Sequence, residues 1–113
     1  MQVTADYQNG KLTLRLFGEL DHYAASYTLR SLESAIEEYL PQQCELELSG
    51  LTFMDSSGVA VLLKTERLMR QTGCVHVSGA NEQIQRVLKL SGLGGMIHRD
   101  PTSIKECETI YEC

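Results

Sequence analysis

The sequence predicts one α/β domain over residues 1–113, with a mixed, mostly parallel sheet, an N-terminal antiparallel hairpin and about four helices. The chain has 113 residues, which is enough for one ordinary domain. An Asn-Gly pair separates two apolar segments near the start, and helical and strand patterns alternate after it. Such alternation requires crossover connections, which place neighbouring strands parallel.

The first two strands are expected over residues 3–7 and 11–17, joined by a turn at Asn9-Gly10. In the second strand, leucines at every other position indicate one buried face. Gly18 is expected to end this strand.

A helix follows, with Asp21 as its N-cap because a short carboxylate can bind the free amides of the first turn. Its apolar face is formed by Ala25, Leu29, Leu32, Ile36 and Tyr39. Pro41 ends it, and a third strand is expected over 44–49. In that strand Glu45 and Glu47 alternate with apolar residues, so one side of the sheet should face water here.

The remaining elements are expected at regular intervals to the end of the chain. They are a helix from Ser56 or Ser57 to near Gly73, a strand over 74–77, a helix capped by Asn81 and closed by Gly92, a weak strand over 96–98, and a last helix opened by Asp100-Pro101.

Composition excludes several classes of function. The net charge of −5 and the scattered basic residues disfavour nucleic acid as a partner. No apolar run is long enough to span a membrane, and the N-terminus lacks a signal peptide, so we expect a cytoplasmic protein with no membrane partner. Its four cysteines should then be thiols. The sequence contains no Cys-x-x-Cys pair, so a metal site is not expected. No cofactor is expected.

The segment Phe53-Met54-Asp55-Ser56-Ser57-Gly58 is the most informative, because it lies where a strand ends and a helix begins. A serine there can cap the helix, receive a phosphate or act as a nucleophile. The Gly-x-Ser-x-Gly elbow of serine hydrolases is absent, as are the glycine-rich nucleotide loops. Glu19 and Asp21 could form a general-acid pair, but a strand end and a helix cap explain them more simply. We therefore expect a protein that is not an enzyme.

Spacing within the helix that starts at this segment suggests a second feature. Val59, Leu62, Leu63 and Met69 share a face with Glu66, and that face should pack on the sheet. Val61 and Leu68 fall nearly opposite, beside Lys64. They could form a docking surface, or they could be scattered exposed aliphatics that need no explanation.

At these residues the chain resembles the STAS domains of anti-sigma factor antagonists, most closely the sporulation branch. The resemblance rests on Gly18-Glu19-Leu20-Asp21, on the segment from Leu51 to Val59, and on Ser91-Gly92-Leu93. It covers essentially the whole chain in the right order. The first two motifs are specific only in combination.

The resemblance implies a partner switch. The unphosphorylated protein would bind an anti-sigma factor that is also a serine kinase, and so release a sigma factor for transcription. Phosphorylation of Ser56 would end that binding, and a metal-dependent serine phosphatase would restore it. The residues expected to contact the partner are Glu19, Asp21, His22, Asp55, Ser57, Gly58, Val61 and Leu68.

STAS-like domains also serve as structural subunits of lipid-transport machines and as scaffold pieces of stress-signalling assemblies. In those roles the serine need not be phosphorylated, so this alternative keeps the fold and removes the switch.

Overall fold

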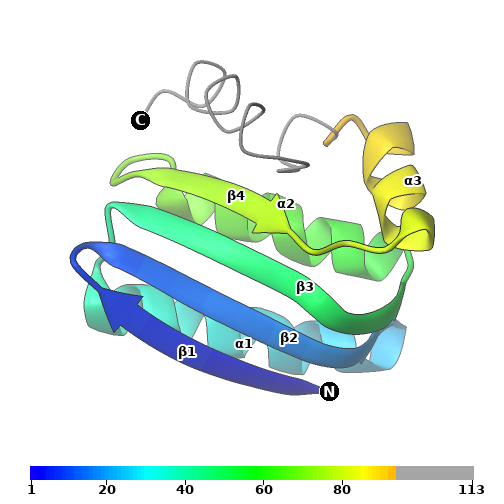
Figure 1. The fold of residues 1–113 in the computed structure, drawn as a ribbon, viewed down its shortest axis with the longest axis horizontal. Coiled ribbons are helices and arrows are strands. Elements are labelled where there is room, and N and C mark those ends of the chain that lie inside the picture. The colour runs from blue at the N-terminus through cyan, green and yellow to red at the C-terminus, as the bar shows by residue number, and fades with distance from the viewer. Residues whose placement is uncertain (94–113) are drawn as a thin grey trace.

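The computed structural model describes residues 1–93 (Figure 1). Its elements in chain order are β1 (Gln2–Gln8), β2 (Lys11–Leu20), α1 (His22–Tyr39), β3 (Gln43–Met54), α2 (Ser56–Met69), β4 (Cys74–Ser78) and α3 (Glu82–Leu90). The strands form one sheet in the order β1-β2-β3-β4, and only the β1–β2 pair is antiparallel among the described strands. The predicted mixed, mostly parallel sheet with an opening hairpin is confirmed.

The hairpin turn has the predicted chemistry. Asn9 and Gly10 both have positive φ, at 52° and 85°, which is the signature of a type I′ turn. Gln8 and Lys11 are paired on either side of this turn. Because the turn fixes the register, Val3, Ala5 and Tyr7 lie opposite the buried leucines of β2.

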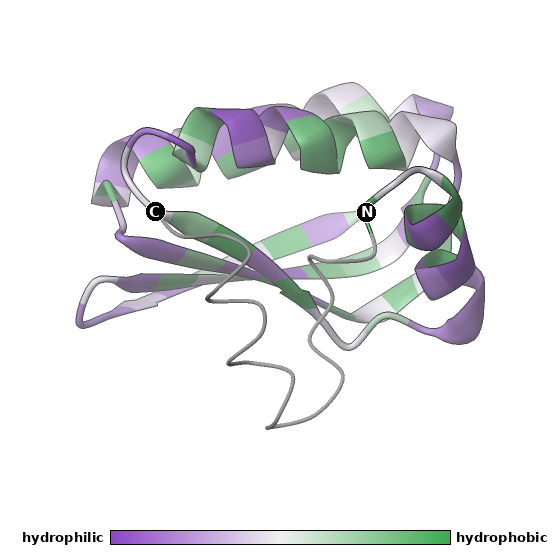
Figure 2. Ribbon diagram, turned by 90° about the horizontal axis from the view of Figure 1, so that it is seen from above, coloured by the Kyte–Doolittle hydropathy of each residue, from purple (hydrophilic) through white to green (hydrophobic). Residues whose placement is uncertain are grey.

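Helices α1 and α2 cover the same face of the sheet (Figure 2). The core between these layers is built from the alternate positions of β2, β3 and β4, including Leu12, Leu14, Leu16, Cys44, Leu46, Leu48, Val75 and Val77. Glu45 and Glu47 point to the other face and are half-buried, and Glu45 forms an ion pair of 2.9 Å with Lys11. The alternation expected in β3 is therefore confirmed.

Two strands run further than expected. Gly18 does not end β2: it has a φ of +112° and lies at a register shift beside Glu19, and the strand continues to Leu20. The glycine permits an irregularity inside the strand rather than a turn. Likewise β3 continues past Ser49 to Met54, paired with β2 along this extension. Both strands therefore reach directly to the helices that follow them.

The C-terminal end of α2 was predicted too late in the chain. The helix ends at Met69, and the amides of Thr72 and Gly73 donate to the Met69 carbonyl, at 3.0 and 2.7 Å. These bonds close a turn after the helix.

The expectation that Val61 is exposed is wrong. Val61 is only 3% exposed. Helix α2 packs against α1 as well as against the sheet, so more than one face of the helix is covered. A single-faced helical wheel does not anticipate this second contact. Leu68 is exposed as expected, at 38%.

Cysteines give a mixed outcome. Cys44 is a free, buried thiol, whereas Cys74 is disulfide-bonded, so the expectation of a thiol is wrong there. The strand expected over 96–98, the last helix, Cys107 and Cys113 lie outside the described residues. No helix within residues 1–93 is long and apolar enough to cross a membrane.

Candidate functional site

The ends of β2 and β3 lie side by side at one edge of the fold. Leu20 pairs with Met54 in the parallel register, and the Asp55 amide donates to the Leu20 carbonyl at 3.4 Å. The next residues, Asp21 and Asp55, therefore leave the sheet together. Each then begins a helix that crosses back over the same face of the sheet (Figure 1).

Both helices are capped by these aspartates. The Oδ1 atom of Asp21 accepts from the Ala24 amide at 3.0 Å. The Oδ1 atom of Asp55 accepts from the amides of Ser57 and Gly58, at 2.9 and 3.4 Å. The cap of α2 is thus a carboxylate, so the structure does not support the possibility that a serine caps this helix.

Ser56 therefore does not cap α2. It is the first residue of α2 and its side chain is exposed, whereas Ser57 is half-buried. A hydroxyl at this position is accessible to another protein. It also lies at the positively polarised end of the helix, where negative charge is favoured.

Gly58 explains how the helix can begin so close to the strand ends. A Cβ atom at this position would lie 2.5 Å from Met54 Cγ, 2.9 Å from Leu20 Cγ and 3.0 Å from the Leu20 carbonyl oxygen. Gly58 is buried, so it acts through packing and is not part of the surface that a partner can reach.

Gln83 of α3 holds the end of β3 through two hydrogen bonds, and sequence reasoning missed it. Its amide nitrogen donates to the Met54 carbonyl at 2.9 Å, and its Oε1 atom accepts from the Met54 amide at 3.2 Å. Its partners are backbone atoms 29 residues away, so no local pattern could have indicated the contact. The result is a strand end held by α3 directly before Asp55 and Ser56.

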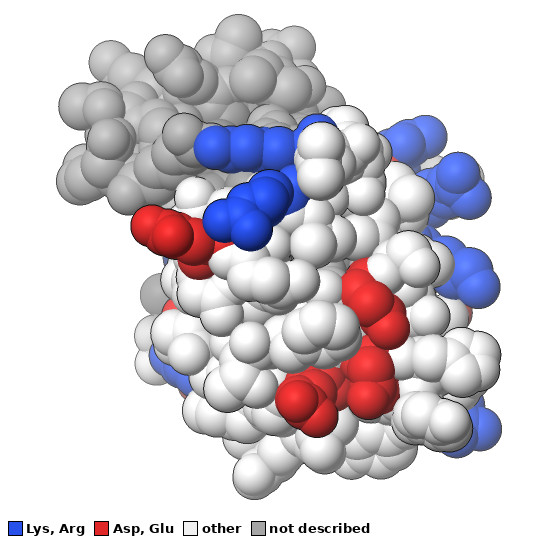
Figure 3. All heavy atoms as spheres, turned by 90° about the vertical axis from the view of Figure 1, so that its right-hand side faces the viewer, with Lys and Arg blue, Asp and Glu red and all other residues white. Residues whose placement is uncertain are grey.

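Acidic side chains gather on the end of the molecule where α1 and α2 begin (Figure 3). Glu19 is exposed near the end of β2, and Asp21 and Asp55 are half-buried at the helix starts. His22 is exposed at the first position of α1, the position that Ser56 occupies in α2, and its ring meets the edge of the Tyr23 ring at a centroid distance of 5.7 Å.

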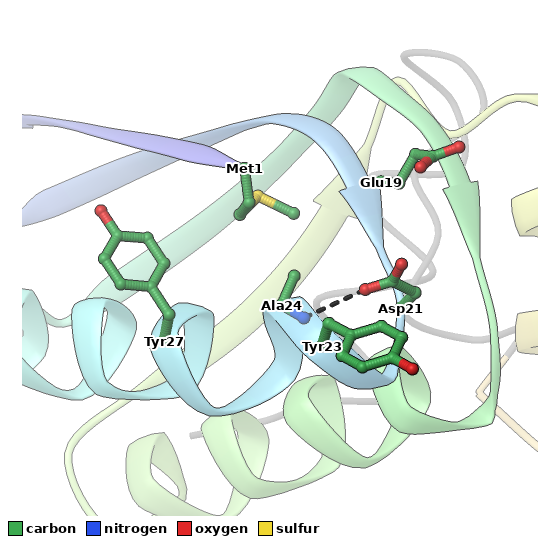
Figure 4. Close-up of a pocket in the computed structure, with 6 residues that line it drawn as sticks. All are labelled: Met1, Glu19, Asp21, Tyr23, Ala24 and Tyr27. Atoms are coloured by element: carbon green, nitrogen blue, oxygen red, sulfur yellow. Dashed lines mark hydrogen bonds between the residues drawn. The ribbon is translucent and has the colours of Figure 1, made fainter.

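A shallow depression of about 450 Å³ adjoins this acidic end (Figure 4). It is lined by Met1, Glu19, Asp21, Tyr23, Ala24 and Tyr27. Tyr23 is 91% exposed and lies beside Asp21, while Tyr27 lies one turn further along α1. The depression is open and rimmed by aromatic rings, which suits contact with another protein better than enclosure of a small molecule.

The structure therefore brings together only some of the expected site residues. Glu19, Asp21, His22, Asp55, Ser56 and Ser57 lie at this end of the fold. Leu68 lies twelve residues further along α2 than Ser56, about 18 Å by the rise of a helix. Within residues 1–93, no group of three or more His, Cys, Asp or Glu side chains could hold a metal ion.

Comparison with known proteins agrees with this geometry. The model of the STAS domain matches residues 2–106. The anti-sigma F factor antagonist of Paenibacillus polymyxa is 37% identical over 97 residues, which cover 82% of this chain and 80% of that protein. The antagonist of the same name from Lysinibacillus sphaericus is 34% identical over 84 residues, covering 74% of this chain and 72% of that protein.

Solved structures give the same result. The anti-sigma factor antagonist SpoIIAA in its unphosphorylated form superposes with a TM-score of 0.76 at 25% identity, covering 99% of this chain and 98% of that chain. The phosphorylated form of the Bacillus cell fate determinant SpoIIAA gives 0.69 at 25% identity, covering 93% and 97%. With its strand order, its aspartate-capped helices and these matches, the chain belongs to the STAS domain family.

Proposed function

We propose that the chain is an anti-sigma factor antagonist whose binding is switched by phosphorylation of Ser56. In its unmodified form it binds an anti-sigma factor that is also a serine kinase, and this binding frees a sigma factor. Phosphorylation of Ser56 by that kinase ends the binding, and a metal-dependent serine phosphatase reverses it. The chain itself catalyses no reaction in this scheme, and it acts in the cytoplasm.

The observation that carries the proposal is the exposed Ser56 side chain at the first position of α2, next to a helix cap provided by Asp55. Asp55 satisfies the amides of Ser57 and Gly58. Helix α2 is therefore capped whether or not Ser56 is modified. A phosphate can be added at the surface without removing a contact of the fold.

Charge at the site explains why modification would repel a partner. A phosphate adds about −1.5 to −2 charges at neutral pH. It would join the carboxylates of Asp55, Glu19 and Asp21, which lie at or next to the paired ends of β2 and β3. A partner that accommodates a neutral hydroxyl would then meet a concentrated negative charge.

The magnitudes are sufficient. A tenfold loss of affinity requires about 1.4 kcal/mol. One like-charge contact at about 4 Å costs about 4 kcal/mol at an effective dielectric constant near 20. A single unfavourable contact between the phosphate and a partner carboxylate would therefore release the partner.

The resemblance to antagonists supports the same assignment, since the two curated relatives are named anti-sigma F factor antagonists. The related SpoIIAA has been solved in both unphosphorylated and phosphorylated forms. In this chain the surface for the partner would comprise Glu19, Asp21, His22, Asp55 and Ser57, and Leu68 would contribute only if the partner extends along α2.

The test is a phosphorylation assay with the anti-sigma factor cloned from the genome that encodes this chain. The chain is incubated with that protein and Mg-ATP, and its mass is followed. We expect one phosphoryl group on wild type and on Ser57→Ala, and none on Ser56→Ala. Phosphate on the Ser56→Ala variant would refute the assignment of Ser56. If the folded wild type gains no phosphate, the role as a structural or scaffold subunit is favoured instead.

A further inference from the structure

The free edge of the sheet at β1 has no covering element among the described residues. Every residue of β1 except Val3 is exposed, and β1 has one neighbour, β2. An uncovered edge strand presents unpaired backbone groups that favour the addition of another strand. Natural edge strands are often protected by lysine or proline, and β1 contains neither.

The hairpin geometry shows which groups are available. Gln8 and Lys11 flank a two-residue turn and form the first hydrogen-bonded pair of the ladder. Alternate residues of β1 therefore bond to β2, and the residues between them, Val3, Ala5 and Tyr7, direct their amides and carbonyls outward. Ala5 is the midpoint of β1.

Helix α1 leaves a groove above this strand. The groove is about 530 Å³ and is lined by Ala5 of β1 together with Tyr27, Arg30, Ser31, Ser34, Ala35, Glu38 and Tyr39 of α1. The Tyr7 and Tyr39 rings stack at one end of it, with centroids 5.0 Å apart. Tyr7, Tyr27 and Tyr39 remain 39%, 51% and 37% exposed, which is a large aromatic surface for a small domain.

The charged residues of the groove are arranged symmetrically. Arg30 and Glu38 lie four residues to either side of Ser34, and neither forms an ion pair within residues 1–93. Both line the groove that contains Ala5, the midpoint of β1. An axis through Ala5 and near Ser34 would therefore place Arg30 of one copy opposite Glu38 of another.

We propose that this face binds a second copy of the chain, with β1 pairing antiparallel to β1 of the partner across a two-fold axis at Ala5. The two sheets become one continuous sheet, and the two α1 helices pack antiparallel over the join. Val3 faces Tyr7 of the other copy, an aliphatic–aromatic pair of the kind that stabilises antiparallel sheets. Isologous contacts of this type close on themselves and do not extend into fibres.

A second copy fits this face because the register about Ala5 is self-complementary. An axis at Asp6 would set two carboxylates directly opposite each other, and an axis at Thr4 would lose the Val3–Tyr7 pair. The axis at Ala5 avoids both problems. It also places Arg30 of each copy opposite Glu38 of the other copy. Ser56 lies on α2, outside the groove, so the dimer leaves Ser56 accessible. Tyr27 is shared, because it lines both this groove and the depression beside the acidic end.

Sedimentation velocity with the full chain, under reducing conditions, tests the proposal. We expect the apparent mass to rise with concentration from 12.6 kDa toward twice that value. Arg30→Glu and Glu38→Arg each place like charges in contact and should weaken the dimer at least tenfold. The double variant Arg30→Glu/Glu38→Arg restores the opposite charges and should return the dimer constant to near the wild-type value. Lys64→Glu, on the exposed side of α2, is the matched control and should have no effect.

Backbone pairing is tested separately. Ala5→Pro removes an outward amide, which in this geometry does not bond to β2, so the fold should persist by circular dichroism while the dimer is lost. The proposal is overturned if the wild type stays monomeric up to about 1 mM. At that concentration even a dimer with a millimolar dissociation constant would be detected. It is also overturned if folded Ala5→Pro still dimerises or if the charge reversals have no effect. None of these outcomes bears on the phosphorylation of Ser56.

Discussion

Asp21 and Asp55 occupy equivalent positions in two successive strand–helix units. Each follows a residue of the paired ends of β2 and β3, and each caps the helix that follows through a single carboxylate oxygen. The first helical residues, His22 and Ser56, are both exposed as a result. The two capping carboxylates therefore also contribute negative charge to this surface, beside the exposed Glu19.

Asp55 both caps α2 and carries a negative charge, and two variants can separate these roles. Asp55→Ala removes the side-chain acceptor of the Ser57 amide, while the Gly58 amide keeps the Asp55 backbone carbonyl at 3.0 Å. The variant should lower the free energy of unfolding by about 1 kcal/mol in a urea titration. Asp55→Asn keeps a capping oxygen and removes the charge, so it should stay close to the wild-type stability. If both variants lose equal stability, charge rather than capping holds the start of α2.

Gly58→Ala should destabilise the fold although alanine is the better helix former. The new methyl group would lie within 3.0 Å of Met54 and Leu20 atoms, one of them a backbone oxygen. We expect a loss of about 1–3 kcal/mol in the free energy of unfolding. Without the clash, intrinsic propensity would favour alanine by about 1 kcal/mol. Ala60→Ser, on the exposed side of the same helix, is the control and should change the stability by less than about 0.5 kcal/mol. A stabilised Gly58→Ala protein would contradict the close approach.

Thr28 and Thr65 are a matched pair of fully buried threonines in helices. The Thr65 hydroxyl donates to the Val61 carbonyl at 2.9 Å, whereas the Thr28 hydroxyl has no hydrogen-bond partner within residues 1–93. Thr28→Val should therefore be neutral or stabilising by about 1 kcal/mol, and Thr65→Val should be destabilising by about the same amount. Thermal or urea unfolding of both variants compares them, and the reverse order would show that the hydroxyl of Thr28 is satisfied.

Cys44 predicts a loss of stability at high pH. Burial, with a smaller contribution from Glu45, raises the pKa of its thiol from 9.0 to about 12. Between these values the unfolded chain releases a proton that the folded protein retains, so the free energy of unfolding falls as pH rises above about 9. The slope attributable to this group is at most about 1.4 kcal/mol per pH unit. Cys44→Ala should remove that part of the decline, and an identical pH profile in the variant would exclude the thiol as its source.

Local sequence patterns predicted the elements that depend on neighbouring residues. The Asn9-Gly10 turn, the caps at Asp21 and Asn81 and the alternation of β3 are determined within a few positions, and the structure confirms them. Local patterns gave wrong predictions where the deciding contact joins residues far apart in the sequence. The extension of β2 beyond Gly18 depends on pairing with β3. Helix α2 packs against α1 as well as against the sheet, and the helical wheel does not include that second contact.

The candidate site shows the same division. The motif around Ser56 was visible in the sequence, but its proximity to Asp21 required the register of β2 and β3. The identity of the capping group also required the structure, because both an aspartate and a serine at this boundary suit the role. Gln83 could not have been found, since it binds only backbone atoms of Met54.

In the proposed switch, charge at Ser56 controls binding to the anti-sigma factor. The direct measurement is the affinity of the anti-sigma factor for the unmodified chain and for the chain phosphorylated at Ser56, compared by calorimetry at the same ionic strength. Phosphorylation should weaken binding at least tenfold, which corresponds to about 1.4 kcal/mol, while the two forms show the same circular dichroism. Equal affinity of the two folded forms would contradict the account.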